Sequence, residues 1–351
     1  MNQRTSSQQR RPSLPRFVRL ILLGMVLSVV LAATPVLAWT DAGHKIVASI
    51  AFRQLTPEQQ RKLSELLEYH PRFANDFTGK MPVEVGDEEV SEWRLQQAAI
   101  WPDIARRFSE ENKVLFHRGP WHYINSPLFL TDADRLTMAS DPRLALKTEV
   151  PATEAARLEM NVLQTIAFAR QQLADPSVSK AERAVLLCWL CHLVGDLHQP
   201  LHSTASFSQK LYPEGDHGGN LIRTQLRSNL HSLWDGFPGG KLNLREARND
   251  ALTLMANPEL QPLGPAAAAQ LDHLVWFEES RKLALLVVYT PEILTPLQGL
   301  ESERSAGETA ELSPIPKLGL SEEYLRTGGH VAQRRLVEAG YRLGAVLAEI
   351  P

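Results

Sequence analysis

The sequence has little cysteine, because Cys188 and Cys191 are the only two in 351 residues. Two cysteines cannot form the disulfide framework of a small secreted domain, so stability must come from a hydrophobic core. Their three-residue spacing inside an apolar run favours packed thiols over a redox pair. Strand signals are also sparse: residues 220–226 alone suit half of a short β-hairpin. We find no internal repeat, so these absences favour one all-α, single-domain helical bundle with at most one hairpin.

The sequence also lacks an excess of basic residues. Its formal net charge is −3, and the first 38 residues contain five arginines and no acids. The remainder therefore has 32 basic and 40 acidic residues, a net charge of −8. A protein that binds nucleic acid through a broad basic surface has the opposite balance. If this protein binds phosphates, a local source such as metal ions must supply the positive charge.

Residues 1–38 have the pattern of a signal peptide. Five arginines precede the apolar run 20–33, which is too short to span a bilayer comfortably. A breaker and small residues follow at 34–38, so cleavage after Ala38 is expected to leave Trp39 as the first residue. The chain also has no Asn-x-Ser/Thr acceptor site. These features predict an exported bacterial protein, periplasmic or extracellular, although an uncleaved membrane anchor remains an alternative.

Helix signals dominate residues 39–351, which we expect to form the functional domain. Thr56-Pro57-Glu58-Gln59 and Ser179-Lys180-Ala181-Glu182 are capping boxes, and Pro102 should kink or restart the segment that contains it. Residues 71–90 and 297–318 are expected to be surface loops. The predicted helices cover residues 42–55, 57–68, 92–108, 153–174, 179–200, 245–256, 265–288 and 322–350.

Two histidine–aspartate pairs carry the chemical signal. His192 and Asp196 are four residues apart, as are His231 and Asp235, so each pair shares one helix face. Zinc accepts such nitrogen and oxygen donors. A single pair of this kind is more often a surface ion pair or a satisfied core histidine. Two pairs, with His202 between them and glycine-rich turns around them, favour a metal site.

Five motifs in order resemble the zinc-dependent single-strand nucleases of the S-one/P-one type, which share a helical fold with bacterial zinc phospholipases C. The resemblance covers roughly residues 39–235. Its motifs are Trp39-Thr-Asp-Ala-Gly-His44, Trp121-His-Tyr-Ile-Asn125, His192-Leu-Val-Gly-Asp196-Leu-His-Gln-Pro-Leu-His202, Gly215-Asp-His-Gly-Gly-Asn220 and Asn229-Leu-His231-Ser-Leu-Trp-Asp235.

The resemblance implies three zinc ions and assigns their ligands. The first zinc would be held by Asp103, His122, His192 and Asp196. The second would take His44, Asp196 as a bridge, and the free amine and carbonyl oxygen of Trp39. The third would take His202, His231 and Asp235.

The Trp39 assignment has a chemical reason of its own. An α-amino group titrates near 7.7–8.0, so a metal displaces its proton at modest cost, whereas an amide nitrogen inside a chain does not ligate in this way. Signal-peptide cleavage would then complete the metal cluster. The alternative is that Trp39 only packs in the core.

The resemblance also implies residues that act on the substrate. Asp103 and Arg106 would be catalytic, with Arg106 beside the phosphate. Tyr123 and Asn125 would stack on a base and hydrogen-bond to it, where many relatives carry Phe and Asp. An amide donates as well as accepts a hydrogen bond, so the base preference need not match that of the relatives.

These residues predict a secreted trinuclear-zinc endonuclease that cleaves single-stranded DNA and RNA to 5′-phosphate products and also acts on 3′-nucleotides. We expect a monomer with no stable protein partner and no membrane association after signal cleavage. One alternative is a zinc phospholipase C acting on phosphodiester lipids. Another is a non-catalytic zinc-binding protein, although structural zinc sites are usually closed.

Overall fold

A computed structural model describes residues 39–307 and 314–351 of the chain. The chain divides into two units, Met1–Pro35 and Val36–Pro351, and everything described below lies within the second. The predicted signal peptide, 1–38, falls outside the described residues. The boundary before Trp39 therefore stays a prediction.

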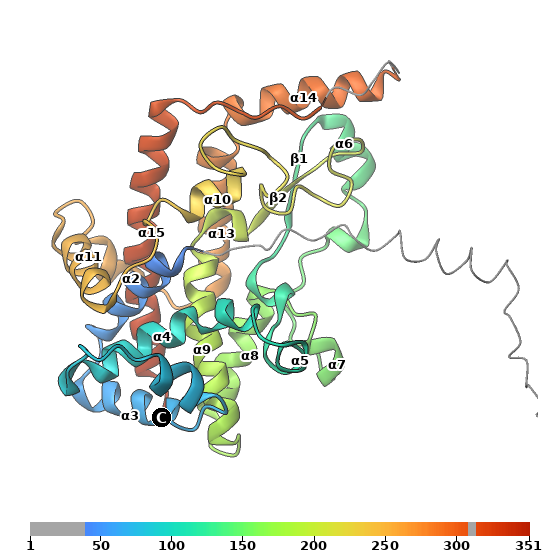
Figure 1. The fold of residues 1–351 in the computed structure, drawn as a ribbon. Coiled ribbons are helices and arrows are strands. Elements are labelled where there is room, and N and C mark those ends of the chain that lie inside the picture. The colour runs from blue at the N-terminus through green and yellow to red at the C-terminus, as the bar shows by residue number, and fades with distance from the viewer. Residues whose placement is uncertain (1–38, 308–313) are drawn as a thin grey trace, which may run out of the picture. The chain divides into compact units, whose positions relative to one another are not determined.

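Helices make up most of the described chain, which confirms the predicted all-α fold (Figure 1). The α-helices are α2 (Asp41–Phe52), α3 (Pro57–Leu67), α4 (Val90–Ala105), α5 (Glu110–Phe116), α6 (Asp132–Met138), α7 (Glu154–Arg157), α8 (Val162–Ala174), α9 (Lys180–Leu197), α10 (Leu230–Asp235), α11 (Leu244–Ala256), α12 (Leu263–Ala268), α13 (His273–Leu283), α14 (Pro291–Ser305) and α15 (Glu322–Ala348). Shorter 3-10 and π segments are η1 (Phe73–Phe77), η2 (Thr78–Lys80), η3 (Asp87–Glu89), η4 (Gly119–His122), η5 (Pro142–Leu144), η6 (Pro200–His202) and η7 (Ala284–Val288).

Capping residues explain several of these boundaries. The Thr56 hydroxyl accepts from Gln59 N and the Gln59 side chain accepts from Thr56 N, which confirms the predicted capping box. The helix predicted over 153–174 is instead two helices, α7 and α8. Asn161 starts a new helix there, because its side chain accepts from the backbone of Leu163 and Gln164. Pro102 does not restart α4, which ends three residues later.

The helices bury one large core around α9. Helix α9 packs against α4 and α8, while α2 packs against α4, α11 and α15. In Figure 1 the first described helix, α2 (blue), lies beside the last, α15 (red). That contact needs a small residue, because a Cβ on Gly340 would lie 2.4 Å from the Ile50 Cβ. The close approach holds the start of the chain beside the centre of the fold.

The two strands form a parallel pair, so the predicted hairpin is wrong. Strand β1 (Ser126–Phe129) pairs with β2 (Thr204–Phe207), with Ser126 opposite Thr204. A hairpin joins neighbouring antiparallel strands, whereas these are linked by a long helical crossover that includes α8 and α9. Residues 220–226 contribute only one isolated parallel bridge, Thr224 to Leu318.

The two predicted loops contain more helix than expected. Residues 71–90 include η1, η2 and η3, and α14 continues to Ser305 into the predicted loop 297–318. Pro291 sits at the first turn of α14, where a proline is compatible with a helix.

Within the described ranges, no single helix is long and apolar enough to cross a membrane. Two consecutive helical segments, His273–Val288 and Pro291–Ser305, reach that length and apolar composition when they are taken together, but the pair is bent.

Candidate metal centre and substrate pocket

The predicted histidine and aspartate ligands gather into three groups of possible metal-binding atoms. Within each group the nitrogen and oxygen atoms lie within 4.8 Å of one another. The groups are His122 with His192 and Asp196, His44 with Asp103 and His192, and His202 with His231 and Asp235. His192 belongs to two of them, so these two groups adjoin.

Asp196 is the centre of the adjoining groups. Its carboxylate lies 2.9 Å from His122 Nδ1 and 3.2 Å from His192 Nε2, through the same oxygen, Oδ2. The other oxygen, Oδ1, lies 3.4 Å from His44 Nε2. One carboxylate therefore faces ligand candidates on both sides, which is the geometry of a bridging ligand. All three histidines and Asp196 are buried.

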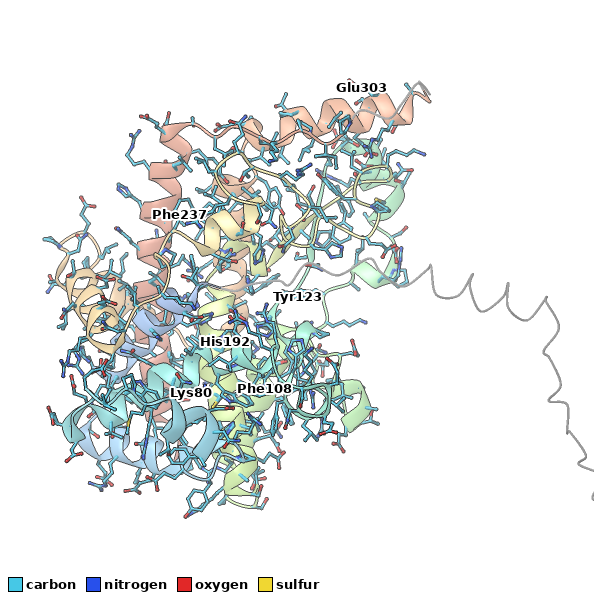
Figure 2. The ribbon with its side chains drawn as sticks, in the orientation of Figure 1. Lys80, Phe108, Tyr123, His192, Phe237 and Glu303 are labelled. Atoms are coloured by element: carbon cyan, nitrogen blue, oxygen red, sulfur yellow. The ribbon has the colours of Figure 1, made fainter. Side chains whose placement is uncertain are left out.

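His44 and Asp103 complete the adjoining groups from two other helices. The ring of His44, on α2, stacks on the ring of His192 with centroids 3.9 Å apart. Asp103, near the end of α4, places Oδ1 3.7 Å from His192 Nε2. A Cβ on Gly195 would lie 2.8 Å from His44 Nδ1, so only glycine leaves room for the His44 ring. Figure 2 shows His192 in the interior of the helical part.

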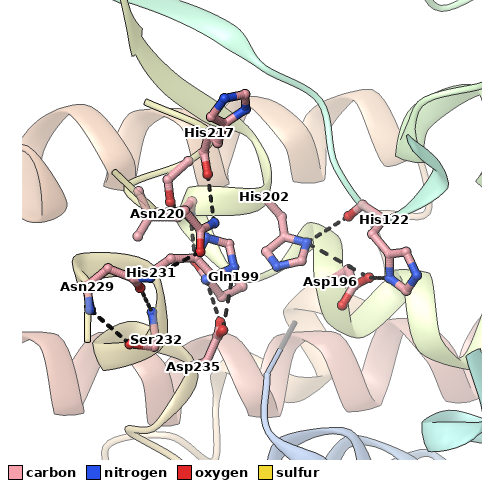
Figure 3. Close-up of polar contacts among 12 residues, drawn as sticks. His122, Asp196, Gln199, His202, His217, Asn220, Asn229, His231, Ser232 and Asp235 are labelled. Atoms are coloured by element: carbon pink, nitrogen blue, oxygen red, sulfur yellow. Dashed lines mark hydrogen bonds and ion pairs between the residues drawn. The ribbon is translucent and has the colours of Figure 1, made fainter. Parts of the chain in front are cut away.

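The third group lies where η6 and α10 meet. His231 Nε2 is 3.4 Å from Asp235 Oδ2 on the same helix, as the four-residue spacing predicts. His202 stacks at a tilt against His231, with ring centroids 4.9 Å apart. Figure 3 shows His202 between His231 and Asp196, and Asp196 Oδ2 is 3.9 Å from His202 Nδ1.

Backbone carbonyls orient three of the histidines. The Nδ1 atoms of His192, His202 and His231 each lie 2.7 Å from a carbonyl oxygen. The carbonyls belong to Ala99, His122 and Gly218, respectively. Because a carbonyl only accepts, each Nδ1 carries a proton, so in the neutral ring Nε2 is the nitrogen available to a metal. This second contact fixes the tautomer that metal ligation requires.

Several buried polar atoms in these groups have no hydrogen bond to any residue of 39–307 or 314–351, which is unusual in a protein interior. They are His44 Nδ1 and Nε2, His122 Nε2, Asp196 Oδ1, His202 Nε2 and Asp235 Oδ2. A bound cation would satisfy the ligand atoms among them. The donor set of imidazoles and carboxylates is the one that zinc prefers. The site therefore fits zinc.

Burial favours the neutral form of His122 and His44, whereas the Asp196 and Asp103 carboxylates outweigh burial and raise the pKa of His192. Burial lowers the pKa of His122 to about 3, although the hydrogen bond to Asp196 opposes the shift. Burial also lowers the pKa of His44. For Asp235 burial raises the pKa, and the nearby Asp196 and Asp103 carboxylates add to the increase. Neutral imidazoles beside closely spaced carboxylates are suited to a cation.

Trp39 lies against the ligand groups. Its side chain is fully buried, and its Cδ1 would be 3.9 Å from a Cβ on Gly195. The next residue, Thr40, donates its backbone N–H to the carbonyl oxygen of Asp235 at 3.2 Å. The predicted first residue of the mature protein therefore sits beside helices that carry ligands of different groups.

Arg106 lies one turn beyond Asp103 and contacts it directly. The guanidinium donates through Nη2 to Asp103 Oδ1. Both side chains are only slightly exposed, at 13% for Arg106 and 11% for Asp103. The Nε of Arg106 is buried without a hydrogen bond. The predicted catalytic pair thus forms an ion pair at the edge of the adjoining groups.

Tyr123 and Asn125 line a small pocket beside the third group. The other residues that line it are Leu201, His217 and His231. The segment that leads into β1 holds them beside η6, because Ile124 N donates to the carbonyl oxygen of His202 at 2.8 Å. The predicted substrate residues are therefore held beside His231.

Three further residues support the site and were not among the predicted site residues. Gln199 donates to Asp235 Oδ1 at 2.8 Å and accepts from Leu201 N at 2.6 Å. The buried Asp216 accepts from Tyr289 Oη at 2.8 Å and from Ser206 N at 2.9 Å. His217 is exposed at the pocket with a φ of +54°. The sequence signal that could have identified His217 is its position within the Gly-Asp-x-Gly-Gly-Asn turn.

Comparisons with known proteins agree with this geometry. The family model described as S1/P1 Nuclease matches residues 39–351. Endonuclease 2 of Arabidopsis thaliana is 24% identical over 326 residues, 91% of this chain and 92% of that protein. Endonuclease 4 of the same plant is 29% identical over 324 residues, 90% and 89% of the two chains. Nuclease P1 of Penicillium citrinum is 35% identical over 101 residues, 28% of this chain and 35% of that protein.

Proposed function

Because this chain belongs to the S1/P1 nuclease family and is a hydrolase of phosphodiester bonds in nucleic acid, we propose that it is a secreted endonuclease that uses three zinc ions. Its substrates are single-stranded DNA and RNA, its products carry 5′-phosphates, and it also hydrolyses 3′-nucleotides. The observation that carries the proposal is Asp196, whose two oxygens face His122 and His192 on one side and His44 on the other.

The ligand assignment agrees with the third group and divides the two adjoining groups differently, because Asp103 lies near both His44 and His192. Asp103, His122, His192 and Asp196 would hold one ion. His44 and Asp196 would hold the second together with the amine and carbonyl of Trp39, and His202, His231 and Asp235 would hold the third. Zinc at these positions supplies Lewis-acid stabilisation of phosphoryl charge and lowers the pKa of an attacking water.

The protein's own residues orient the reaction. The Asp103 carboxylate accepts a hydrogen bond from the attacking water and aligns it with phosphorus. Arg106 is held by Asp103, and its guanidinium donates to the phosphoryl oxygens as negative charge develops there. Attack in line with the 3′ oxygen expels that oxygen and leaves the phosphate on the 5′ side of the next nucleotide.

Tyr123 and Asn125 explain the preference for single strands. A base reaches Tyr123 and Asn125 at the pocket beside His231 only when it is unstacked, because the bases of a duplex are stacked and paired inside it. Tyr123 stacks on this base, and the Asn125 amide both donates and accepts at its polar edge. A duplex keeps its bases inside and is a poor substrate.

Secretion and activation are coupled through Trp39. Signal-peptide cleavage creates the α-amine that serves as a ligand, so the precursor lacks one zinc site. The burial of Trp39 and the Thr40–Asp235 hydrogen bond support this role, because the backbone at Trp39 is already held beside the ligand helices. The predicted periplasmic or extracellular location follows from the same segment.

The test compares the mature protein starting at Trp39 with a version that has one extra alanine before Trp39. We expect chelator-sensitive cleavage of single-stranded DNA and RNA by the first, and loss of one zinc and most activity in the second. Equal zinc content and equal activity would refute the N-terminal ligand and leave the nuclease standing. If zinc is bound but neither protein cleaves nucleic acid, the proposed function is wrong.

A further inference from the structure

A second hollow adjoins the substrate pocket through the same two residues. Tyr123 and Asn125 line the pocket beside His231, and they also line a larger groove on their other side. The groove continues past Ser126 to the segment 143–147 and to the start of α8. A chain that leaves the first pocket past Tyr123 therefore enters this groove next.

The groove is fixed in shape by the first residues of α8. The Asn161 side chain donates to the carbonyl oxygen of Lys147 at 2.8 Å, and Gln164 donates to that of Glu149 at 2.6 Å. On the other side, the backbone N–H of Val162 donates to the carbonyl oxygen of Tyr123 at 3.2 Å. The same helix end thus holds both Tyr123 and Lys147, so their separation is set by the fold.

The charges of the groove point to a phosphate at Lys147. Arg143 is already paired with Asp141 at 2.7 Å and with Glu214 at 3.1 Å, so its charge is largely balanced. Lys147 takes part in no ion pair with any residue of 39–307 or 314–351, and its side chain is exposed. The groove contains one carboxylate, Glu159, which disfavours an anion near it. Lys147 is therefore the cation available to an anionic ligand.

We propose that this groove binds the nucleotide on the 5′ side of the one stacked on Tyr123, with Lys147 contacting the phosphate that joins them. The inference rests on the proposed function, and it takes the nucleotide stacked on Tyr123 as the one that provides the leaving 3′ oxygen. Its 5′ phosphate then points away from the metal groups and into the groove. Asn125 lies between the two positions and contacts both nucleotides.

The subsite predicts that the enzyme distinguishes substrates by a single 5′ phosphate. The dinucleotide ApA has no phosphate at this position, whereas pApA and ApApA do. Wild-type kcat/KM should be about threefold to tenfold higher for pApA than for ApA, the range expected for one charge-assisted contact. Lys147→Ala should remove that difference and leave ApA cleavage unchanged, and Lys147→Arg should keep the difference.

Salt dependence gives a second readout on longer strands. Loss of one phosphate contact should reduce the slope of log kcat/KM against log salt by about 0.7 for a single strand. Lys62→Ala is the matched control, because Lys62 is an exposed lysine on α3 that lines neither hollow. It should leave both the slope and the preference for pApA unchanged.

The outcomes separate this inference from the proposed function. Cleavage of ApA without any preference for pApA, or a preference that survives Lys147→Ala, overturns the subsite alone. Equal losses on ApA and pApA in Lys147→Ala would show a general electrostatic effect and also overturn it. If wild-type protein with zinc bound cleaves none of these substrates, the proposed function itself fails.

Discussion

The Nδ1 atom of His202 lies 2.7 Å from the backbone carbonyl oxygen of His122. The two histidines belong to different ligand groups, so the backbone of one group fixes the tautomer of a ligand in the other. The reverse contact, from Ile124 N to His202 O at 2.8 Å, starts the parallel β1–β2 pair. These two contacts therefore link one candidate ligand of the adjoining groups, His122, to one of the third group, His202, and a substitution at either residue should shift the other.

Gly195 should be essential for the ligand group that contains His44. A Cβ at this position would lie 2.8 Å from His44 Nδ1, and the His44 ring cannot move freely because it stacks on His192. We expect Gly195→Ala to lose one zinc, measured by elemental analysis, and to lower kcat/KM for single-stranded DNA at least tenfold.

The matched control for this change is Gly299→Ala on α14, where an added Cβ meets no atom of the described residues within 4 Å. Alanine in a helix interior should stabilise the protein by about 0.5–1 kcal/mol relative to glycine. Full zinc content in Gly195→Ala would show that His44 is not a ligand.

Gln199 should increase the zinc affinity of the third group by positioning its ligands, without being a ligand itself. Its amide donates to Asp235 Oδ1 and accepts from Leu201 N, so it fixes both the carboxylate and the turn before His202. Gln199→Ala should weaken zinc binding at one site about tenfold to a hundredfold, measured by titration with a competing chelator. Gln171→Ala, at an exposed position on α8, should have no effect. Unchanged affinity at every site would contradict the positioning role.

Removal of zinc should destabilise the protein. Without a cation, one oxygen of each buried carboxylate, Asp196 Oδ1 and Asp235 Oδ2, has no hydrogen bond from any described residue, and neither has His202 Nε2. A saturating ligand contributes about 4 kcal/mol per site at a thousandfold excess over its Kd. Excess EDTA should therefore lower Tm by about 10 °C or more, and added zinc should restore it. An unchanged Tm would argue against metal sites in the folded core.

Local spacing is what made the site partly predictable from sequence. His192 with Asp196 and His231 with Asp235 meet because residues four apart share a helix face. The stacking of His44 on His192 joins residues far apart in the chain and depends on how α2 packs against α9. No local pattern contains that information, and only the family resemblance placed His44 at the site.

In the fold, too, local features could be predicted from the sequence, whereas long-range pairings could not. Helices with capping boxes, such as the one after Thr56, could be read directly from the sequence. The break between α7 and α8 was missed, although Asn161 followed by Gln164 is a readable capping signal. The parallel β1–β2 pair could not be read, because its partners are about 80 residues apart and their pairing depends on η6 and the helices between them.

A pH test can probe the ion-pair network that joins α13 to α15. Glu279 accepts from Arg342 at 2.6 and 2.8 Å and from Arg335 at 2.8 Å, with Glu338 and His198 packed against the same arginines. Burial raises the pKa of Glu279, but the two arginines outweigh it and lower the pKa to about 2.

Because the folded pKa lies below the ordinary value of about 4.5, Glu279 stabilises the fold above pH 4.5 and loses this effect as pH falls toward 2. In chelator, Glu279→Gln should lower Tm clearly at pH 6 and much less at pH 3. Glu303→Gln, at an exposed position on α14, is the control and should change Tm little at either pH (Figure 2). If Glu279→Gln lowers Tm as much at pH 3 as at pH 6, the negative charge of Glu279 is not the source of the stability that it adds beside Arg335 and Arg342.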